Sequence, residues 1–297
     1  MQVPGRSHRA LRAMFALGAM LAFARIACSP LENALATVIV KAPRRGSPAP
    51  AEPELGEVRV AVGPPAATLS LAVVDPPERA KATVFVLHGI RGSKVESGMR
   101  IWSEMLTAAG FRVILVDLRG HGRSTGDDLS YGVLESRDLA QVLDAVEARG
   151  LRIGSVGVMG NSYGAAAALE WAGRDARVHA VVAVSPFASL RSVVPAYAVL
   201  PLPSGFVNEV IDRGGQQGHF DPDEASPVVA ITHTTSPVLL IHGEDDRRIP
   251  SAHSQQIFAA GKEHAELVLV PGAGHRSIVE HPLLRERATS WFARYLL

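Results

Sequence analysis

A serine stands between two glycines at the point where an apolar run ends and an alanine-rich run begins. The sequence from residue 156 to residue 166 reads Val-Gly-Val-Met-Gly-Asn-Ser-Tyr-Gly-Ala-Ala. A serine hydroxyl is a weak nucleophile at neutral pH and needs an adjacent base. A sharp strand-to-helix turn would hold Ser162 in an uncommon backbone conformation and expose its oxygen. The alternative is a serine that only caps the following helix, and a histidine after a later strand would favour the nucleophile.

Candidate acids and a histidine follow later in the chain, each in the loop after an apolar run. The run 238–241 ends in His-Gly-Glu-Asp-Asp, and the run 267–270 leads through a glycine-containing loop to His275. An imidazole can take the proton of a serine, and a carboxylate can hold that imidazole in the required tautomer. We therefore predict Ser162 as nucleophile and His275 as general base. The candidates for the acid are Glu244, Asp245 and Asp246.

The elements that must position these side chains alternate along the chain. Short apolar runs bounded by turn residues indicate strands, and apolar residues at helical spacing indicate helices. The expected strands cover residues 57–62, 69–74, 83–87, 112–117, 153–159, 178–184, 238–241 and 267–270. The expected helices cover residues 98–109, 133–148, 162–172, 252–260 and 283–295. This alternation predicts an α/β fold, with a mostly parallel central sheet and helices on both faces.

Ligands of such sheets bind outside the carboxyl ends of the strands, where this chain carries a set of short motifs. They are His88-Gly89-Ile90, the stretch 117–124, Gly160-Asn161-Ser162-Tyr163-Gly164, His242-Gly243-x-x-Asp246 and Gly274-His275. In this order they resemble the motifs of the α/β-hydrolase superfamily, over the whole body from residue 57 to residue 297. Within that superfamily, the chain is similar to bacterial esterases, lysophospholipases and serine-aminopeptidase-like hydrolases. It lacks the Gly-Gly-Gly loop of one lipase subgroup.

The resemblance implies roles for particular residues. The His-Gly-x-x-Asp spacing of the family points to Asp246 as the acid, with Asp245 and Glu244 as alternatives. The oxyanion hole is expected from the backbone N–H groups of Ile90 and Tyr163. The family inserts a lid where the alternation of strands and helices lapses, at about residues 187–236.

The lid segment is apolar and interrupted by prolines. A small lid lined by apolar residues indicates an acyl-binding pocket. The alternative is a helix that simply covers the edge of the sheet.

Other polar residues near the strand ends are assigned structural roles. We expect a turn network from Asp117, Arg119, His121 and Ser124, hydrogen bonds behind the site from His88 and His242, and solvated side chains at His253, His264 and His281.

Composition narrows the possible partners. With 30 Lys and Arg against 29 Asp and Glu, the net charge is +1, and no basic stripe supports nucleic-acid binding. The eleven histidines show no His-Glu-x-x-His spacing. The glycines around residues 120–126 differ in spacing from a dinucleotide fingerprint. We expect a small-molecule substrate, no metal and no cofactor.

The N-terminus has the pattern of an export signal. Three arginines precede the apolar run 14–24, which ends in an Ala-x-Ala site. Cleavage after Ala24, lipid attachment at Cys28 and an uncleaved anchor all remain open. Residues 1–28 are therefore predicted to be a signal peptide or anchor, residues 29–56 a Pro/Ala-rich linker and residues 57–297 the hydrolase domain. The expected location is exported or membrane-attached, on the extracytoplasmic side.

These features predict a serine hydrolase that acts through an acyl-enzyme on Ser162. The expected substrate is a carboxylic ester with an apolar acyl group. A peptidase or amidase of the same fold, and a non-enzymatic protein that binds an apolar ligand, are the alternatives.

Overall fold

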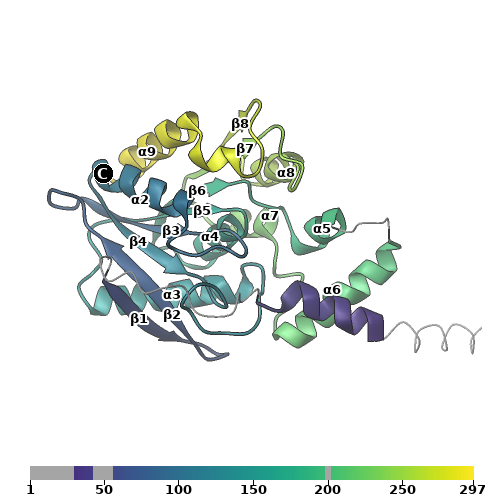
Figure 1. Cartoon of the computed structure of the whole chain (residues 1–297). Coiled ribbons are helices and arrows are strands. Elements are labelled where there is room, and N and C mark those ends of the chain that lie inside the picture. The colour runs from purple at the N-terminus through teal and green to yellow at the C-terminus, as the bar shows by residue number, and fades with distance from the viewer. Residues whose placement is uncertain (1–29, 43–55, 198–201) are drawn as a thin grey trace, which may run out of the picture.

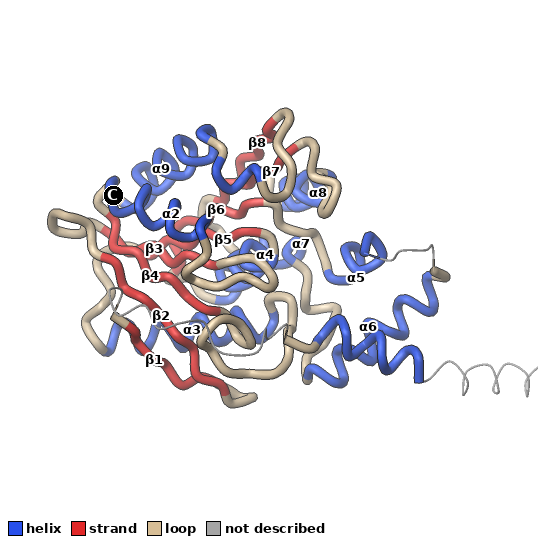
Figure 2. Tube along the Cα trace, in the orientation of Figure 1, coloured by secondary structure: helices blue, strands red, loops and turns tan. Residues whose placement is uncertain are grey.

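The structure is a computed structural model that describes residues 30–42, 56–197 and 202–297. Its centre is a sheet of eight strands in the order β1-β2-β4-β3-β5-β6-β7-β8, drawn in red in Figure 2. The strands are β1 (Glu57–Val62), β2 (Ala67–Val74), β3 (Ala82–Leu87), β4 (Phe111–Asp117), β5 (Val156–Asn161), β6 (Val178–Val184), β7 (Val238–Gly243) and β8 (Ala265–Val270). β2 pairs antiparallel with β1 and β4, and the other neighbours pair parallel.

Helices cover both faces of this sheet (Figure 1). Buried residues of α3 (Val133–Ala148), α4 (Tyr163–Arg174) and α8 (Ala252–Ala260) join one hydrophobic cluster. Buried residues of α2 (Ser97–Ala108) and α9 (Pro282–Leu296) join the cluster on the other face. The predicted α/β class, with its mostly parallel sheet between two helical layers, is confirmed.

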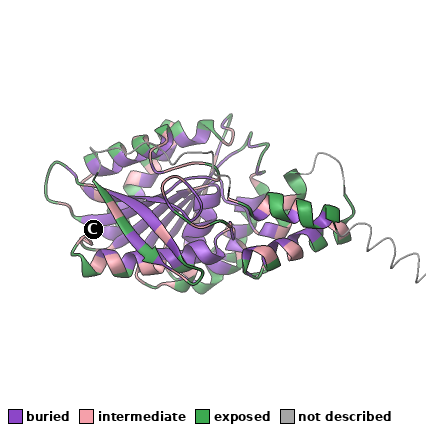
Figure 3. Ribbon diagram, turned by 60° about the horizontal axis from the view of Figure 1, so that its bottom comes forward, coloured by how far each residue is buried: buried purple, intermediate pink, exposed green. Residues whose placement is uncertain are grey.

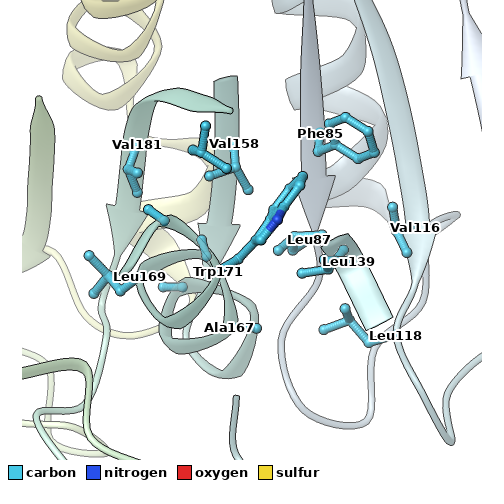
Figure 4. Packing of buried hydrophobic residues seen from close by; sticks show 14 of the residues in the cluster. Phe85, Leu87, Val116, Leu118, Leu139, Val158, Ala167, Leu169, Trp171 and Val181 are labelled. Atoms are coloured by element: carbon cyan, nitrogen blue, oxygen red, sulfur yellow. The ribbon is translucent and has the colours of Figure 1, made fainter. Parts of the chain in front are cut away.

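The central strands are apolar along their whole length because both of their faces are covered. All six residues of β3 are buried. Figure 4 shows the packing on one face, where Trp171 of α4 lies against Phe85 of β3. Their rings meet edge to face with centroids 5.1 Å apart. This core fixes the ends of the strands that carry the candidate site.

Several strand boundaries differ from the sequence prediction by one to three residues, and the largest difference is at the start of β5. β5 begins at Val156, whereas the apolar run predicted a start at Ile153. Gly154 has a φ of +58°, and a Cβ on it would lie 2.5 Å from the carbonyl oxygen of Lys81. The chain therefore turns here and enters the sheet three residues later than expected.

The predicted lid segment divides into two parts. Its first part contains the short helix α5 (Leu190–Val193), a 3₁₀ turn (Val194–Tyr197) and the long helix α6 (Ser204–Gly218). Its last part contains α7 (Pro227–Ala230), which packs against α4 and α8 of the body. The first part contributes residues to the cavity above Ser162, and the second part packs on the body.

α6 was not predicted, because it contains four glycines. Glycine disfavours a helix by about 1 kcal/mol relative to alanine. Three of the four are needed for close packing: a Cβ would lie 3.1 Å from Ile39 at Gly214, 2.5 Å from Pro222 at Gly215 and 2.9 Å from Phe220 at Gly218. Tertiary contacts, not helix propensity, stabilise this helix.

The linker prediction for residues 29–56 is wrong for residues 30–40, which form a helix. Ala36 and Val40 in this helix are fully buried, so it is a packed element and not an extended tether. Figure 1 shows it in purple beside α6. The predicted signal segment, including Ala24 and Cys28, lies outside the described residues. None of the helices that the structure describes is both long and apolar enough to span a bilayer.

Candidate active site

Ser162 occupies a strained turn between β5 and α4. Its φ of 55° and ψ of −112° lie outside the usual regions for a residue with a side chain. Its N–H donates to the carbonyl oxygen of Val184 at 2.7 Å, which anchors the turn to β6. A Cβ at Gly160 would lie 2.2 Å from the carbonyl oxygen of Gly164. A Cβ at Gly164 would lie 2.5 Å from the carbonyl oxygen of His88, so both flanking glycines are required by the close approach of strand and helix.

His275 connects Ser162 to Asp246. Its Nδ1 lies 2.6 Å from Oδ2 of Asp246, and its Nε2 lies 3.0 Å from Oγ of Ser162. A carboxylate only accepts hydrogen bonds, so Nδ1 carries the proton and Nε2 is free to accept the proton of the hydroxyl. The geometry is that of a nucleophile, a general base and an orienting acid.

The loops after β7 and β8 lie against each other and bring the acid to the histidine. The N–H of Asp245 donates to the carbonyl oxygen of Ala273 at 3.0 Å. A Cβ at Gly243 would lie 2.2 Å from that same oxygen, so only glycine fits there. Asp246 is buried, whereas Asp245 and Glu244 are exposed. Of the three candidate acids, only Asp246 contacts the imidazole.

Asp246 is held in its charged form. Burial alone would raise its pKa, but hydrogen bonds from His242, His275 and the N–H of Ile249 outweigh burial and lower the pKa below its ordinary value. Oδ1 accepts from the N–H groups of Arg248 and Ile249, each at 2.9 Å. A charged carboxylate in this position can stabilise the imidazolium that forms when His275 takes up a proton.

His242 supports Asp246 from behind, as predicted. Its Nε2–H donates to the carbonyl oxygen of Ile249 at 2.8 Å and lies 3.3 Å from Oδ2 of Asp246. Its Nδ1 accepts from the hydroxyl of Ser254 at 2.7 Å. His88 is likewise structural, because its Nε2 accepts from the N–H of Leu118 at 3.1 Å. Burial lowers the pKa of His88 to about 4, which keeps this ring neutral.

The backbone N–H groups predicted for the oxyanion hole belong to residues that line the same cavity as Ser162. Within the described residues, the N–H groups of Ile90 and Tyr163 donate to no backbone acceptor. The phenol of Tyr163 points elsewhere and donates to Glu135 at 2.7 Å. Both N–H groups are therefore available to a negatively charged oxygen formed at Ser162.

Two residues that support the oxyanion loop were missed from the sequence. Lys94 is buried, and its ammonium group lies 2.5 Å from Asp117. Glu96 lies beneath the loop, where a Cβ on Gly92 would come within 2.7 Å of its carboxylate. Burial raises the pKa of Glu96 to about 6, although hydrogen bonds from backbone groups of Ser93 and Gly89 oppose the change. Nothing in the sequence marks these two residues, because charged side chains in a loop are typically exposed.

The remaining polar residues behave as predicted only in part, because His264 and His281 are half-buried and each ring makes a hydrogen bond to a backbone group. Asp117 accepts from the N–H of Arg123 at 2.9 Å, and Ser124 donates to the carbonyl oxygen of Asp117 at 2.6 Å, so the predicted turn network exists. The prediction of a solvated His253 is wrong. This side chain is buried beneath the segment after β6, where its Nδ1 accepts from the N–H of Ala188 at 3.2 Å.

A cavity of about 940 Å³ opens above Ser162 and His275. Its lining mixes apolar with polar and charged side chains and comes from the loops of the sheet, from α5 and α6, and from the helix at residues 30–40. Arg91, Arg248 and Glu280 also contribute to the lining. Among residues 30–42, 56–197 and 202–297, no group of three or more His, Cys, Asp or Glu side chains is arranged to hold a metal ion.

Comparison with known proteins agrees with this architecture. An uncharacterized protein, YqkD of Bacillus subtilis, is 28% identical over 205 residues, which cover 65% of this chain and 64% of that protein. The chain thus spans less than two thirds of YqkD. Dipeptidyl peptidase family member 6 of Caenorhabditis elegans is 28% identical, over 65% of this chain and 28% of that protein.

Solved structures share the fold. The esterase Pf2001 of Pyrococcus furiosus matches 87% of this chain and 99% of its own, with 22% identity and a TM-score of 0.68. A puromycin-hydrolyzing peptidase of Mycobacterium tuberculosis matches 81% of this chain and 39% of its own, with 19% identity and a TM-score of 0.61. The sequence profile of the alpha/beta hydrolase family matches residues 84–286. The chain belongs to the alpha/beta hydrolase family.

Proposed function

We propose that the protein is a serine hydrolase that cleaves carboxylic esters through an acyl-enzyme on Ser162. The observation that carries this proposal is the hydrogen-bond chain from Asp246 to His275 at 2.6 Å and from His275 to Ser162 at 3.0 Å. A serine that only capped the following helix would not explain it, since the Ser162 side chain accepts no cap hydrogen bond.

The reaction follows from these positions. Nε2 of His275 takes the proton of the Ser162 hydroxyl as its oxygen attacks the ester carbonyl. The negative charge on the carbonyl oxygen is stabilised by the N–H groups of Ile90 and Tyr163. The imidazolium returns the proton to the leaving alcohol, which departs and leaves an acyl group on Ser162. Water, activated by the same imidazole, then releases the carboxylic acid and restores the serine.

The apolar part of the cavity lining supports an ester with an apolar acyl group. One observation favours a second candidate, an amidase or peptidase that recognises a free amino group. Glu96 and Glu280 both line the cavity and could pair with an ammonium group.

Replacement of the nucleophile tests the proposal. The full chain should hydrolyse nitrophenyl esters, and Ser162→Ala should lower kcat by about 10⁴-fold or more while the melting temperature changes little. Ser290→Ala, on the exposed side of α9, is the matched control and should retain activity. A fluorophosphonate probe should label the wild type and the control but not Ser162→Ala. Activity that survives in Ser162→Ala would reject the proposal, and preference for aminoacyl amides over esters would favour the second candidate.

We also propose that the protein acts on the extracytoplasmic side of a membrane, either released or attached. The basic and apolar N-terminal sequence supports this location. The intact mass of the mature protein separates cleavage after Ala24 from lipid attachment at Cys28, and an unprocessed N-terminus in the cytoplasmic fraction would contradict export.

A further inference from the structure

The helix at residues 30–40 lies outside the sheet and outside residues 84–286, which match the family profile. It nevertheless contributes Leu35, Val38 and Ile39 to the lining of the cavity above Ser162. We propose that this helix is part of the substrate-binding site and sets the length of the acyl chain that the cavity accepts. The inference rests on the proposed esterase function and adds the element that determines its specificity.

Backbone contacts fix the C-terminal end of this helix next to the site. The carbonyl oxygen of Val40 accepts from the N–H of Leu129 at 2.7 Å. The carbonyl oxygen of Ile39 accepts from the phenol of Tyr131 at 2.6 Å, and Tyr131 itself lines the cavity. The helix is therefore tied directly to a residue of the site.

Apolar packing fixes the face of the helix that turns toward the protein. Val40 is fully buried in a cluster with Val207 and Ile211 of α6, and Ile39 packs against this cluster. Gly214 of α6 allows the approach, because a Cβ there would lie 3.1 Å from both Ile39 and Val40. The two helices lie side by side in Figure 1 and are held by close contact, not by a loose tether.

Polar contacts hold the outer part of the helix to the same partner. Arg213 of α6 donates to Asn33 at 3.0 Å and lies 3.1 Å from Glu32. Thr37 donates to Gln217 of α6 at 2.9 Å. The helix is thus joined to α6 along its length, and the two form one wall of the cavity.

This wall is suited to an extended hydrocarbon chain. Leu35 and Ile39, one turn apart, are half-buried, and Val38 is exposed at the rim. α6 contributes Phe206, Val207 and Val210 to the same lining. The cavity of about 940 Å³ is larger than a short acyl group needs. Each methylene transferred from water to such a surface strengthens binding by about fourfold, so the wall favours long acyl chains.

The decisive experiment narrows the cavity from this helix alone. In the full chain, Leu35→Trp adds bulk inside the cavity, and Leu31→Trp adds the same bulk one turn away on an exposed position that does not line it. Leu35→Trp should lower the ratio of kcat/KM for the decanoyl nitrophenyl ester to kcat/KM for the acetyl ester by about tenfold or more, because the added bulk takes space that the longer chain needs. Leu31→Trp should leave both kcat/KM values within about twofold. An unchanged chain-length profile in Leu35→Trp overturns the inference.

A second variant tests the inference if the Leu35→Trp protein does not fold. Leu35→Ala removes wall area without adding bulk, and it should lower kcat/KM for the decanoyl ester by about fourfold or more relative to the acetyl ester. Equal effects on both esters would overturn the inference.

A binding measurement separates this inference from the proposed function. In the Ser162→Ala background, a fluorescent long-chain fatty acid should bind about tenfold more weakly when Leu35→Trp is added, and Leu31→Trp should have no effect. If Leu35→Trp weakens fatty-acid binding but the wild type hydrolyses no ester, the esterase function is rejected and the role of the helix in the binding site is retained. Ester hydrolysis together with fatty-acid binding that is unaffected by Leu35→Trp would retain the esterase function and reject the role of the helix.

Discussion

Two regions of this molecule solve different problems. The body, which consists of the sheet with α2, α3, α4, α8 and α9 and the loops between them, contains buried ion pairs such as Arg119 with Asp138 at 2.7 Å and Lys94 with Asp117 at 2.5 Å. The cap, which consists of residues 30–40, 187–197 and 204–218, carries ion pairs that are partly exposed, such as Arg191 with Asp212 at 2.7 Å and Arg213 with Glu209 at 2.9 Å. Figure 3 shows the same contrast, with mostly buried strands in the body and many exposed positions on the cap helices.

This difference separates chemistry from selectivity. Removing one partner of a buried ion pair strongly destabilises the folded protein, whereas an exposed ion pair contributes little to its stability. The body can therefore hold the candidate triad in one geometry. The cap is held by apolar packing and partly exposed ion pairs, and it contributes to the wall of the cavity. Substitutions in the body should affect turnover or folding, and substitutions in the cap should affect which ester is preferred.

The largest expected effect is on turnover. Asp246→Asn should lower kcat by about 10⁴-fold, because the amide no longer holds His275 in the tautomer that accepts the serine proton. Asp245→Asn is the matched control, since Asp245 is the adjacent acid, is exposed and does not contact the imidazole. Steady-state kinetics on one nitrophenyl ester give both values, and equal losses in the two variants would remove the role assigned to Asp246.

The next effect is on folding of the body. Gly160→Ala places a Cβ 2.2 Å from the carbonyl oxygen of Gly164, where backbone and not a flexible side chain must move. The free energy of unfolding should fall by about 3 kcal/mol or more. Urea unfolding followed by circular dichroism measures this change. A variant as stable as the wild type would show that the turn between β5 and α4 is less tightly packed than its geometry indicates.

The body was also the region that the sequence predicted well. Its strands are covered on both faces, so they stand out as apolar runs such as 83–87 and 178–184. Its catalytic candidates follow those runs directly, as with Ser162 after β5 and His275 after β8. The choice of Asp246 over its neighbours needed the spacing typical of the family, because three consecutive acids cannot be separated by residue type. The structure separates them by burial.

The cap was predicted poorly for a physical reason. α6 contains Gly214, Gly215 and Gly218, whose role is visible only in the elements that they contact. The helix at residues 30–40 precedes a segment rich in proline, and its buried face matches α6, which lies far away in the sequence. Both helices depend on tertiary contacts, which local periodicity does not report. The burial of Lys94 and the partial burial of Glu96 cannot be read from the sequence for the same reason.

A pH effect tests the contact between α4 and the segment that directly precedes α7. Glu170 of α4 is buried and accepts from the N–H of Ser226 at 2.7 Å. Burial raises its pKa from 4.5 to about 7, so the folded state binds this proton more tightly than the unfolded state. The free energy of unfolding should therefore fall as pH rises between about 4.5 and about 7.

Glu170→Gln removes that titration and keeps an acceptor for Ser226. Between about pH 5 and about pH 8, the wild type should lose about 2 kcal/mol more stability than the variant. Urea unfolding across this range measures the slope. Parallel pH profiles for the two proteins would show that Glu170 does not hold its proton in the folded state.

The smallest expected effect is in the cap. It is tested by the same glycine-to-alanine change as at Gly160. Gly205 lies in the first turn of α6 and is exposed, and no atom of the described residues beyond its own helical turn lies within 4 Å of the position that a Cβ would occupy. Gly205→Ala should therefore stabilise the protein by about 0.5 kcal/mol or leave it unchanged, because alanine loses less conformational freedom in a helix. Thermal unfolding and kcat on a short ester, both close to wild type, are the expected readings. A loss of stability comparable to that of Gly160→Ala would mean that the start of α6 is packed as tightly as the turn at Ser162, and the expected difference between these two parts of the body and the cap would not stand.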